Sequence, residues 1–163
     1  SIVFGLFGYL FFNIYLGWGY SILGGALTLA IMVLPLIMRT TETALMSVPD
    51  AFREGSFGLG AGKLRTVFRV VLPSAVPGIL AGVILGVGRA IGETMAVIMV
   101  AGNQPVVPNS IFSGVRTMTA NIVMEMGYAA DLHREALLAT AVVLFVFILI
   151  INLCFSMLKR RAD

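Results

Sequence analysis

Three long stretches of the chain contain no charged side chain. Residues 1–38, 70–88 and 136–158 lack Asp, Glu, Lys and Arg entirely. A helix that crosses a bilayer needs about 20 mostly apolar residues, so each stretch supplies enough for a membrane span. The first stretch is too long for one crossing, because a helix over residues 1–38 would extend about 57 Å. The pattern therefore predicts membrane helices, with a break inside the first stretch.

The break is expected at Gly17–Tyr20, where two glycines loosen the helix and a Trp and a Tyr favour the membrane interface. The pattern then describes an all-α integral membrane protein with a single transmembrane domain over residues 1–163. A loop at 46–73 and a loop at 102–133 connect the spans. We predict four spans, over about residues 1–16, 21–45, 74–101 and 134–158.

The composition excludes several classes of protein. Hydrophobic residues make up 59% of the chain and charged residues 12%, against about 45–50% and about 25% in soluble domains. Disorder is excluded too, because it requires few apolar residues. One cysteine excludes a disulfide framework, and no cluster of His, Cys and carboxylates indicates a metal or cofactor site. The net charge of +3 does not indicate a nucleic-acid partner, and we expect none.

The distribution of Lys and Arg predicts the orientation in the membrane. Residues 103–133 hold only Arg116, whereas two other regions are basic. The positive-inside rule places those basic regions in the cytoplasm and residues 103–133 outside. The two basic regions are the loop with Arg39, Arg53, Lys63, Arg65 and Arg69, and the C-terminal tail with Lys159, Arg160 and Arg161. Two spans separate them, which agrees with a cytoplasmic C-terminus.

The cytoplasmic loop 46–73 predicts two short helices joined by a glycine hinge. Ser47 is expected to cap the first helix, which should end in the glycines at 58, 60 and 62. The second helix is amphipathic and leads into the next span. One interpretation is a basic loop that only fixes topology; the other is a compact knob that inserts into a partner. A phosphate-binding loop is rejected, because no Gly-Lys-Ser/Thr sequence follows the glycines.

One arrangement in this loop favours the second interpretation. Glu54-Gly55-Ser56, Gly60 six positions after Glu54, and Val70-x-Leu72-Pro73 together resemble the EAA loop of ABC-transporter permease subunits. Gly55 and Ser56 stand where alanines are usual, and both are small. The resemblance implies a type I ABC-importer permease bundle, in which this loop is the coupling helix that docks on a separate ATPase subunit.

Two charges, Arg89 and Glu93, lie inside the third predicted span. A charge at the bilayer centre costs on the order of 3 kcal/mol, so such residues face protein or water rather than lipid. On a continuous helix they share an arc with a ridge of small residues suited to close helix packing, namely Gly78, Gly82 and Gly86. One hypothesis is a structural ion pair at i, i+4. The other is a station for an anion, because Arg binds oxyanions through two parallel hydrogen bonds.

The sequence around this pair has a second resemblance. Gly88–Val97 with Ala101-Gly102-Asn103, then Arg116–Ile122, Glu125-Met126-Gly127 and His133, resemble the phosphate-specific (Pst) ABC permeases, and the C-type more than the A-type. The likeness covers nearly the whole chain and implies that upstream spans are missing. It further implies a bacterial inner-membrane protein and phosphate as the transported ion. The implied partners are a dimer of ATP-binding subunits, an A-type permease, and a periplasmic or lipid-anchored phosphate-binding protein.

The outer loop predicts a short amphipathic helix at the surface, from apolar residues at helical spacing between 115 and 126. Its role is either to cover the bundle or to contact a binding protein, for which Arg116, Asn121 and Glu125 are the polar candidates. His133 is expected to be merely solvated. Other hypotheses are a permease for molybdate or sulfate, an A-type phosphate permease, and a stand-alone channel. An intramembrane enzyme would need paired acids, and we expect no catalysis because only Glu93 is available.

Overall fold

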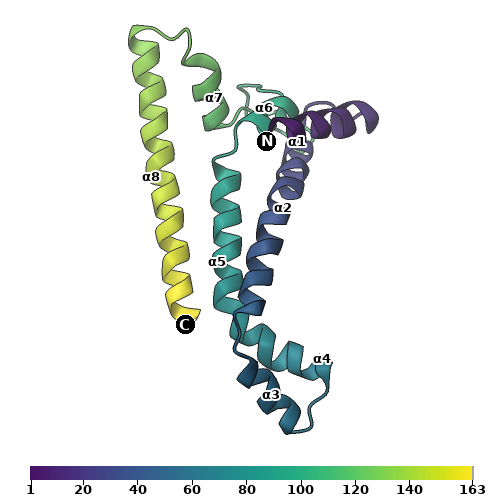
Figure 1. Ribbon diagram of the computed structural model, residues 1–163. Helices are drawn as coiled ribbons and strands as arrows, with labels where there is room; N and C mark the ends of the chain where they lie inside the picture. Colours follow the sequence, from purple (N-terminus) through teal and green to yellow (C-terminus); the bar gives the residue numbers. More distant parts are fainter. Residues whose placement is uncertain (163) are drawn as a thin grey trace. The chain divides into compact units, whose positions relative to one another are not determined.

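The computed structural model describes the backbone of residues 1–162 and the side chains of residues 1–157. The tail side chains Lys159, Arg160 and Arg161, which contributed to the predicted orientation, lie outside the described residues. Within the described part the chain is helical, with one β-bridge between Gly102 and Val115. The helices are α1 (Ile2–Gly8), η1 (Tyr9–Tyr15), α2 (Ile22–Met46), α3 (Asp50–Gly58), α4 (Lys63–Thr66), η2 (Val67–Val71), α5 (Leu72–Ile91), α6 (Met95–Ala101), α7 (Met118–Glu125) and α8 (Asp131–Ala162) (Figure 1).

Three helices in the described part are long and apolar enough to cross a membrane, one fewer than the sequence predicted. They are Ile22–Met46, Lys63–Ile91 and Asp131–Met157. The helix Ile2–Tyr15, formed by α1 and η1, is also apolar but shorter. At 1.5 Å per residue it extends about 21 Å, whereas the hydrocarbon core is about 30 Å thick. Residues 1–16 are therefore helical and apolar, as predicted, and the described helix covers about two thirds of that thickness.

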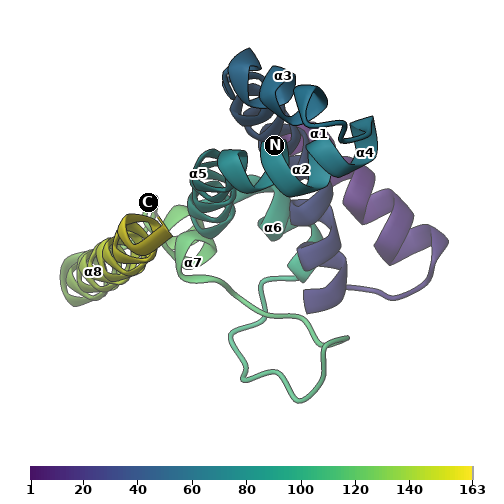
Figure 2. The ribbon, with the colours of Figure 1, turned by 90° about the horizontal axis from the view of Figure 1, so that it is seen from below.

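The break between η1 and α2 lies where the sequence predicted it. Gly17 and Gly19 have φ angles of +68° and +64°, which only glycine adopts without strain. After the break, α2 begins at Ile22, and the first amides of a helix need acceptors outside it. The amide of Ile22 donates to the carbonyl of Ser113 (3.1 Å), and that of Leu23 donates to the carbonyl of Ile111 (3.0 Å). The irregular connection between α6 and α7, visible in Figure 2, thus caps α2.

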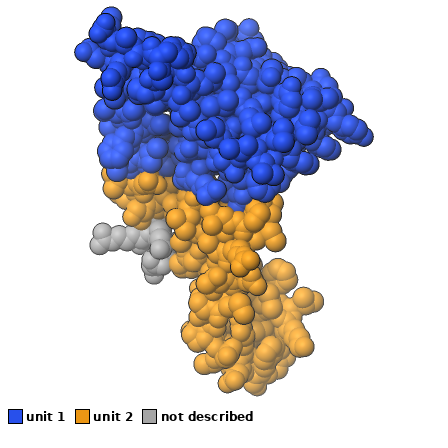
Figure 3. Space-filling view, turned by 45° about the horizontal axis from the view of Figure 1, so that its top comes forward, with its two compact units in different colours: residues 1–33, 88–151 blue, residues 34–87, 152–163 orange. Residues whose placement is uncertain are grey.

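The chain divides into two compact units (Figure 3). Unit 1 contains residues 1–33 and 88–151, and unit 2 contains residues 34–87 together with residues from 152 onward. In unit 1, α1 packs on α6 through small residues: a β-carbon on Gly5 would lie 2.9 Å from the Cα of Ala96. Ala96 and Val100 are fully buried there. Small residues allow the two helix backbones to come close together, so this contact does not depend on large apolar side chains, as is usual between membrane helices.

Unit 2 is held together by a small apolar core between the end of α2 and the start of α5. Its buried residues are Ala44, Val48, Val71 and Ala75. The predicted ridge of glycines on α5 lies on the same contact. A β-carbon on Gly78 would lie 2.6 Å from the Cβ of Ala44, and one on Gly82 would lie 2.8 Å from the Cβ of Thr40. Gly86, one turn further along, is buried.

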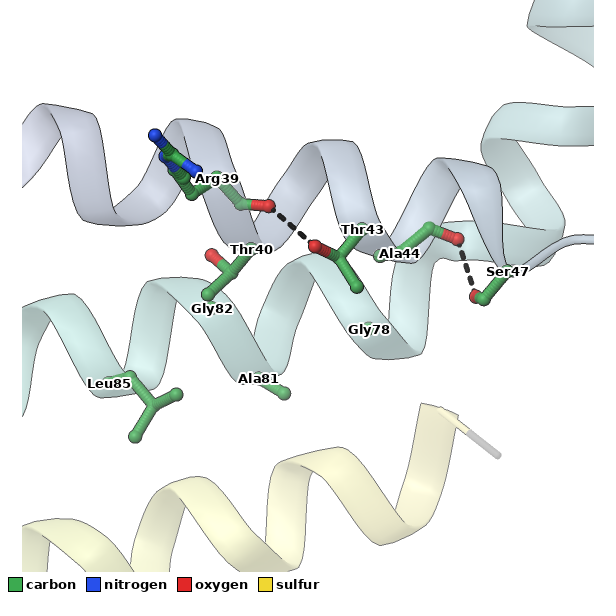
Figure 4. A pocket seen from close by; sticks show the side chains of 9 residues that line it. All are labelled: Arg39, Thr40, Thr43, Ala44, Ser47, Gly78, Ala81, Gly82 and Leu85. Carbon is green, nitrogen blue, oxygen red and sulfur yellow. Dashed lines mark hydrogen bonds between the residues drawn. The ribbon is translucent and has the colours of Figure 1, made fainter.

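A pocket of about 350 Å³ lies beside this contact, between α2 and α5 (Figure 4). Its hydroxyl groups are already used by their own helix. Thr40 donates to the carbonyl of Leu36 (3.0 Å), Thr43 donates to that of Arg39 (3.0 Å), and Ser47 donates to that of Ala44 (2.8 Å). These bonds leave few free polar groups in the pocket. The pocket itself exists because the residues of α5 beside it are small, so we interpret it as a feature of helix packing.

The glycine contact predicts different outcomes for two identical substitutions. Gly78→Ala should destabilise the protein by about 1–3 kcal/mol, because Ala44 has no side-chain torsion that could relieve the overlap. Gly88→Ala on the same helix has nothing within 4 Å of the new methyl group. It should stabilise α5 by about 0.5–1 kcal/mol. Thermal unfolding in detergent measures both, and equal melting temperatures for the two variants would contradict the packing.

Candidate functional site

The two short helices predicted in the cytoplasmic loop are α3 and α4, joined by a tight turn. α3 ends at Gly58, and Gly60 adopts a φ angle of +79°. The amide of Gly60 donates to the carbonyl of Phe57 (2.9 Å), and the amide of Ala61 donates to that of Ser56 (3.1 Å). A left-handed residue just after a helix is the standard way to satisfy its last carbonyls. The position six residues after Glu54 therefore requires a glycine, because its backbone is left-handed.

The predicted cap of α3 is wrong. The N-cap residue is Pro49, which makes no side-chain cap bond, and the hydroxyl of Ser47 donates backwards to the carbonyl of Ala44 (2.8 Å). The physical reason is that α2 continues to Met46, so Ser47 is adjacent to unpaired carbonyls at the end of α2. The charge of Asp50 in the first turn still favours the positive end of the α3 dipole.

Arg53 connects α3 to α2, a contact that the sequence analysis missed. Its guanidinium donates to the carboxylate of Asp50 (2.9 Å) and to the carbonyl of Leu45 (3.0 Å). The i, i+3 spacing of Asp50 and Arg53 was a visible signal for the first bond. The second bond joins residues eight positions apart across a turn, and no periodicity indicates it. The bond to Leu45 joins the start of α3 to the last turn of α2, and the bond to Asp50 lies within α3.

A second contact fixes the other end of α3. The hydroxyls of Ser56 and Thr66 lie 2.9 Å apart, which joins α3 to α4. Thr66 is only 1% exposed. Ser56 is one of the two positions that depart from the usual alanines of the EAA loop, and here the added hydroxyl has a partner. Alanine could not make this bond.

The outward face of α3 is open. No residue of α3 is buried, and Gly55 has nothing within 4 Å of the position that a β-carbon would take. Glu54 is exposed, as are the aromatic rings of Phe52 and Phe57. Leu72 and Pro73, the end of the predicted motif, begin α5 and are also exposed. α3 thus presents acidic and aromatic side chains on a helix that is fixed at both ends.

The third predicted span is not one helix. α5 ends at Ile91, residues 92–94 form a break, and α6 begins at Met95. The physical reason is local: Gly92 favours the helix weakly, and the Glu93 carboxylate accepts from the amide of Ala96 (3.3 Å), as an acidic group at the start of a new helix does. The predicted arc that placed Arg89 and Glu93 on one continuous face is therefore wrong.

The ion pair between Arg89 and Glu93, one of the two hypotheses for these residues, is not formed among the described side chains. The salt bridges among the described side chains do not include either residue. Arg89 is exposed in the last turn of α5, where a positive charge complements the helix dipole. Glu93 instead lines a pocket of about 280 Å³ together with Thr117, Thr119 and the first turns of α2. The two charged side chains therefore have different surroundings.

The outer loop contains the predicted short helix, α7, and a polar network that anchors it. Arg116 donates to the carbonyl of Asn103 (3.2 Å) and to the side-chain oxygen of Asn121 (3.1 Å), and it pairs with the carboxylate of Glu125. His133, on α8, lies 2.9 Å from the other oxygen of Glu125. The expectation that His133 is merely solvated is therefore wrong, because a single carboxylate joins the loop before α7 to the helix after it.

The anchoring role of Arg116 is testable by hydrogen exchange. Arg116→Met removes one bond to the carbonyl of Asn103 and two bonds to Asn121 and Glu125 on α7, and hydrogen bonds to charged groups contribute about 1.5–3 kcal/mol each. The amides of α7 should therefore exchange at least about tenfold faster. Arg134→Met is the matched control, because Arg134 is exposed and the described residues give it no bond. Unchanged protection of α7 in Arg116→Met would contradict the anchor.

Helices of spanning length with a short exposed helix between two of them define a polytopic membrane protein of the α-helical class. The chain belongs to the family described as "Binding-protein-dependent transport system inner membrane component", which it matches over residues 1–163. Members of this family are transport subunits.

Three relatives illustrate the family. The chain is 36% identical to the probable ABC transporter permease protein YqgH of Bacillus subtilis, over 83% of this chain and 46% of that protein. It is 39% identical to the phosphate transport system permease protein PstC of Mesorhizobium japonicum, over 90% and 45%. It is 36% identical to the phosphate transport system permease protein PstA 2 of Mycobacterium bovis, over 100% and 56%. The chain thus spans about half the length of these relatives. No solved structure matches it.

Proposed function

We propose that this chain is part of the C-type permease subunit of an ATP-driven phosphate importer, in which it forms the ion path and couples to a separate ATPase. The observation that carries the proposal is the 39% identity to a phosphate transport permease over 90% of the chain. The relatives named PstC and PstA are phosphate transport permeases, and the residues resembling the C-type favour the first assignment. The proposed location is the bacterial inner membrane, with α3 and the C-terminus in the cytoplasm.

The coupling role rests on how α3 is fixed. Arg53 ties it to the carbonyl of Leu45 in α2, and Ser56 ties it to Thr66 in the helix that continues into α5. A displacement of α3 by an ATPase would therefore act on both helices at once. Glu54, Gly55, Ser56, Gly60, Leu72 and Pro73 are the residues assigned to this coupling.

Each proposed partner would contact a different part of this chain. A dimer of ATP-binding subunits would receive α3, and an A-type permease would complete the ion path. A periplasmic or lipid-anchored phosphate-binding protein would meet the outer loop, where Arg116, Asn121 and Glu125 form a half-buried polar network. In this assignment ATP hydrolysis occurs on the separate subunit, and this chain performs no catalysis.

Arg89 is the proposed cationic station for phosphate. Its guanidinium is exposed, and the described residues supply no carboxylate to neutralise it, so its donors are free for an oxyanion. Glu93 shapes the path by capping α6, not by pairing with Arg89. The same chemistry suits molybdate or sulfate, which are the alternative substrates. An A-type assignment is the other alternative, because the identity to PstA 2 is 36%.

The station predicts a transport defect without an assembly defect. In the full-length permease, Arg89→Gln should lower the phosphate uptake rate at least about tenfold, because a charge-assisted hydrogen bond contributes about 1.5–3 kcal/mol. Arg134→Gln, which removes an exposed charge at the start of α8, should leave uptake unchanged. Radiolabelled phosphate, with molybdate and sulfate as competitors, measures both rate and substrate. Normal phosphate uptake by an Arg89→Gln variant that still assembles would contradict a role of Arg89 in binding phosphate.

The coupling surface predicts a defect of association. Glu54→Lys reverses an exposed charge on α3 without breaking a described bond, so the permease should still fold while the ATPase binds less tightly. We expect the amount of co-purified ATPase to fall at least about tenfold, which corresponds to roughly 1.4 kcal/mol. Glu135→Lys, an equal charge reversal on α8, is the control. Identification of the co-purified subunits by mass spectrometry also tests the proposed partners, and undiminished ATPase with Glu54→Lys would argue against docking at α3.

A further inference from the structure

A second pocket lies where α3 meets the helix that leads into the membrane. It has a volume of about 310 Å³, and its lining combines the turn after α3 with the first two turns of the next helix. The lining residues are Ser56, Leu59, Gly60, Ala61, Arg65, Arg69 and Val70. Arg65 and Arg69 are four positions apart on one helix, and no acidic residue lines the pocket.

The two arginines are without a described counter-charge. The salt bridges among the described side chains use Arg53 and Arg116 but neither Arg65 nor Arg69. Two like charges at i, i+4 repel each other. An anion between them would remove that repulsion, and planar guanidinium groups bind a phosphate through paired hydrogen bonds.

The bond between Ser56 and Thr66 adds a third donor. Thr66 is 1% exposed, and Ser56 is the partner that the structure gives its hydroxyl. A buried O–H that donates to nothing is costly, so Thr66 donates and Ser56 accepts. The proton of Ser56 is then left over, and Ser56 lines the pocket. The pocket thus offers two guanidinium groups and a hydroxyl, a set of donors that suits an oxyanion.

The depth of the pocket in the membrane indicates the source of that oxyanion. The continuous helix Lys63–Ile91 has 29 residues and extends about 43 Å, roughly 13 Å more than the hydrocarbon core. Its charged residues lie near its two ends, Lys63, Arg65 and Arg69 in the first turns and Arg89 in the last turn, and residues 70–88 have none. Arg65 and Arg69 therefore lie at the level of the lipid headgroups. Leu64 and Phe68, on the same turns, are 76% and 63% exposed.

We propose that Arg65, Arg69 and the hydroxyl of Ser56 bind the phosphate of an anionic phospholipid in the cytoplasmic leaflet. Basic groups immediately cytoplasmic of a span attract anionic lipids, and here they form a pocket instead of a diffuse surface. The position of the pocket at the end of the charge-free segment favours a lipid over free phosphate, because a lipid phosphate is held at that level of the membrane. The lipid would fix the base of α5 beside α3, and the site is independent of which ion the permease transports.

The experiment uses the full-length permease with its co-purified subunits, in detergent, titrated with phosphatidylglycerol. Native mass spectrometry counts the bound lipids. The double variant Arg65→Gln/Arg69→Gln should lose at least about tenfold in affinity for one lipid, because two charge-assisted contacts are removed. Lys63→Gln is the matched control: Lys63 is an exposed cation on the same helix that does not line the pocket. It should change the affinity less than about twofold.

Three further arms separate the sources of the anion. Ser56→Ala should weaken phosphatidylglycerol binding by a smaller factor, about threefold, since a neutral donor is lost. Phosphatidylcholine, which has no net charge, should bind weakly, and inorganic phosphate at millimolar concentration should not displace the bound lipid. Equal losses in Lys63→Gln and the double variant, or displacement by inorganic phosphate, would overturn the proposal. Loss of the ATPase from the double variant with lipid binding unchanged would assign the arginines to an acidic protein partner instead.

Discussion

The close approach of α2 and α5 in unit 2 is the constraint on which the other features of that unit depend. Gly78 against Ala44 and Gly82 against Thr40 allow the backbones to meet without intervening side chains. Because the helices are held there, the Arg53 bond to α2 and the Ser56 bond to α4 start from fixed positions. Without that contact the same hydrogen bonds would connect α3 to two helices that move separately. The glycines are thus a mechanical requirement as well as a packing device.

Five arginines of this chain fall into two groups: those that bond to other described residues and those that do not. Arg53 and Arg116 each bond to both a backbone carbonyl and a carboxylate, so their role is to hold loops on helices. Arg65, Arg69 and Arg89 have neither among the described residues. In a chain with 12% charged residues, cations without a counter-charge are costly to retain near lipid. Arg65 and Arg69 also line one pocket, which distinguishes them from the control residues Lys63 and Arg134, for which the described residues supply no counter-charge either.

Much of the fold was predictable because the membrane imposes simple rules. Charge-free length identified α2, α5 and α8, and the paired glycines before Tyr20 identified the break before α2. What failed depended on competition between local alternatives. The hydroxyl of Ser47 could bond either to the end of α2 or to the start of α3. The carboxylate of Glu93 could pair with Arg89 or accept from an amide of α6. Hydropathy does not rank such choices, since it averages over the residues that decide them. The contact of His133 with Glu125 was not predictable either, because it depends on how the chain turns between the two residues.

The arrangement of unit 1 has a consequence for how the protein is made. α1 packs against α6, so Gly5 meets Ala96 only after more than half of the chain has been synthesised. At about 5–20 residues per second, α1 waits roughly 5–20 s for that partner. The hairpin of α3 and α4, by contrast, closes through residues ten positions apart and needs no later segment. The hairpin can therefore close before the contact between α1 and α6 forms.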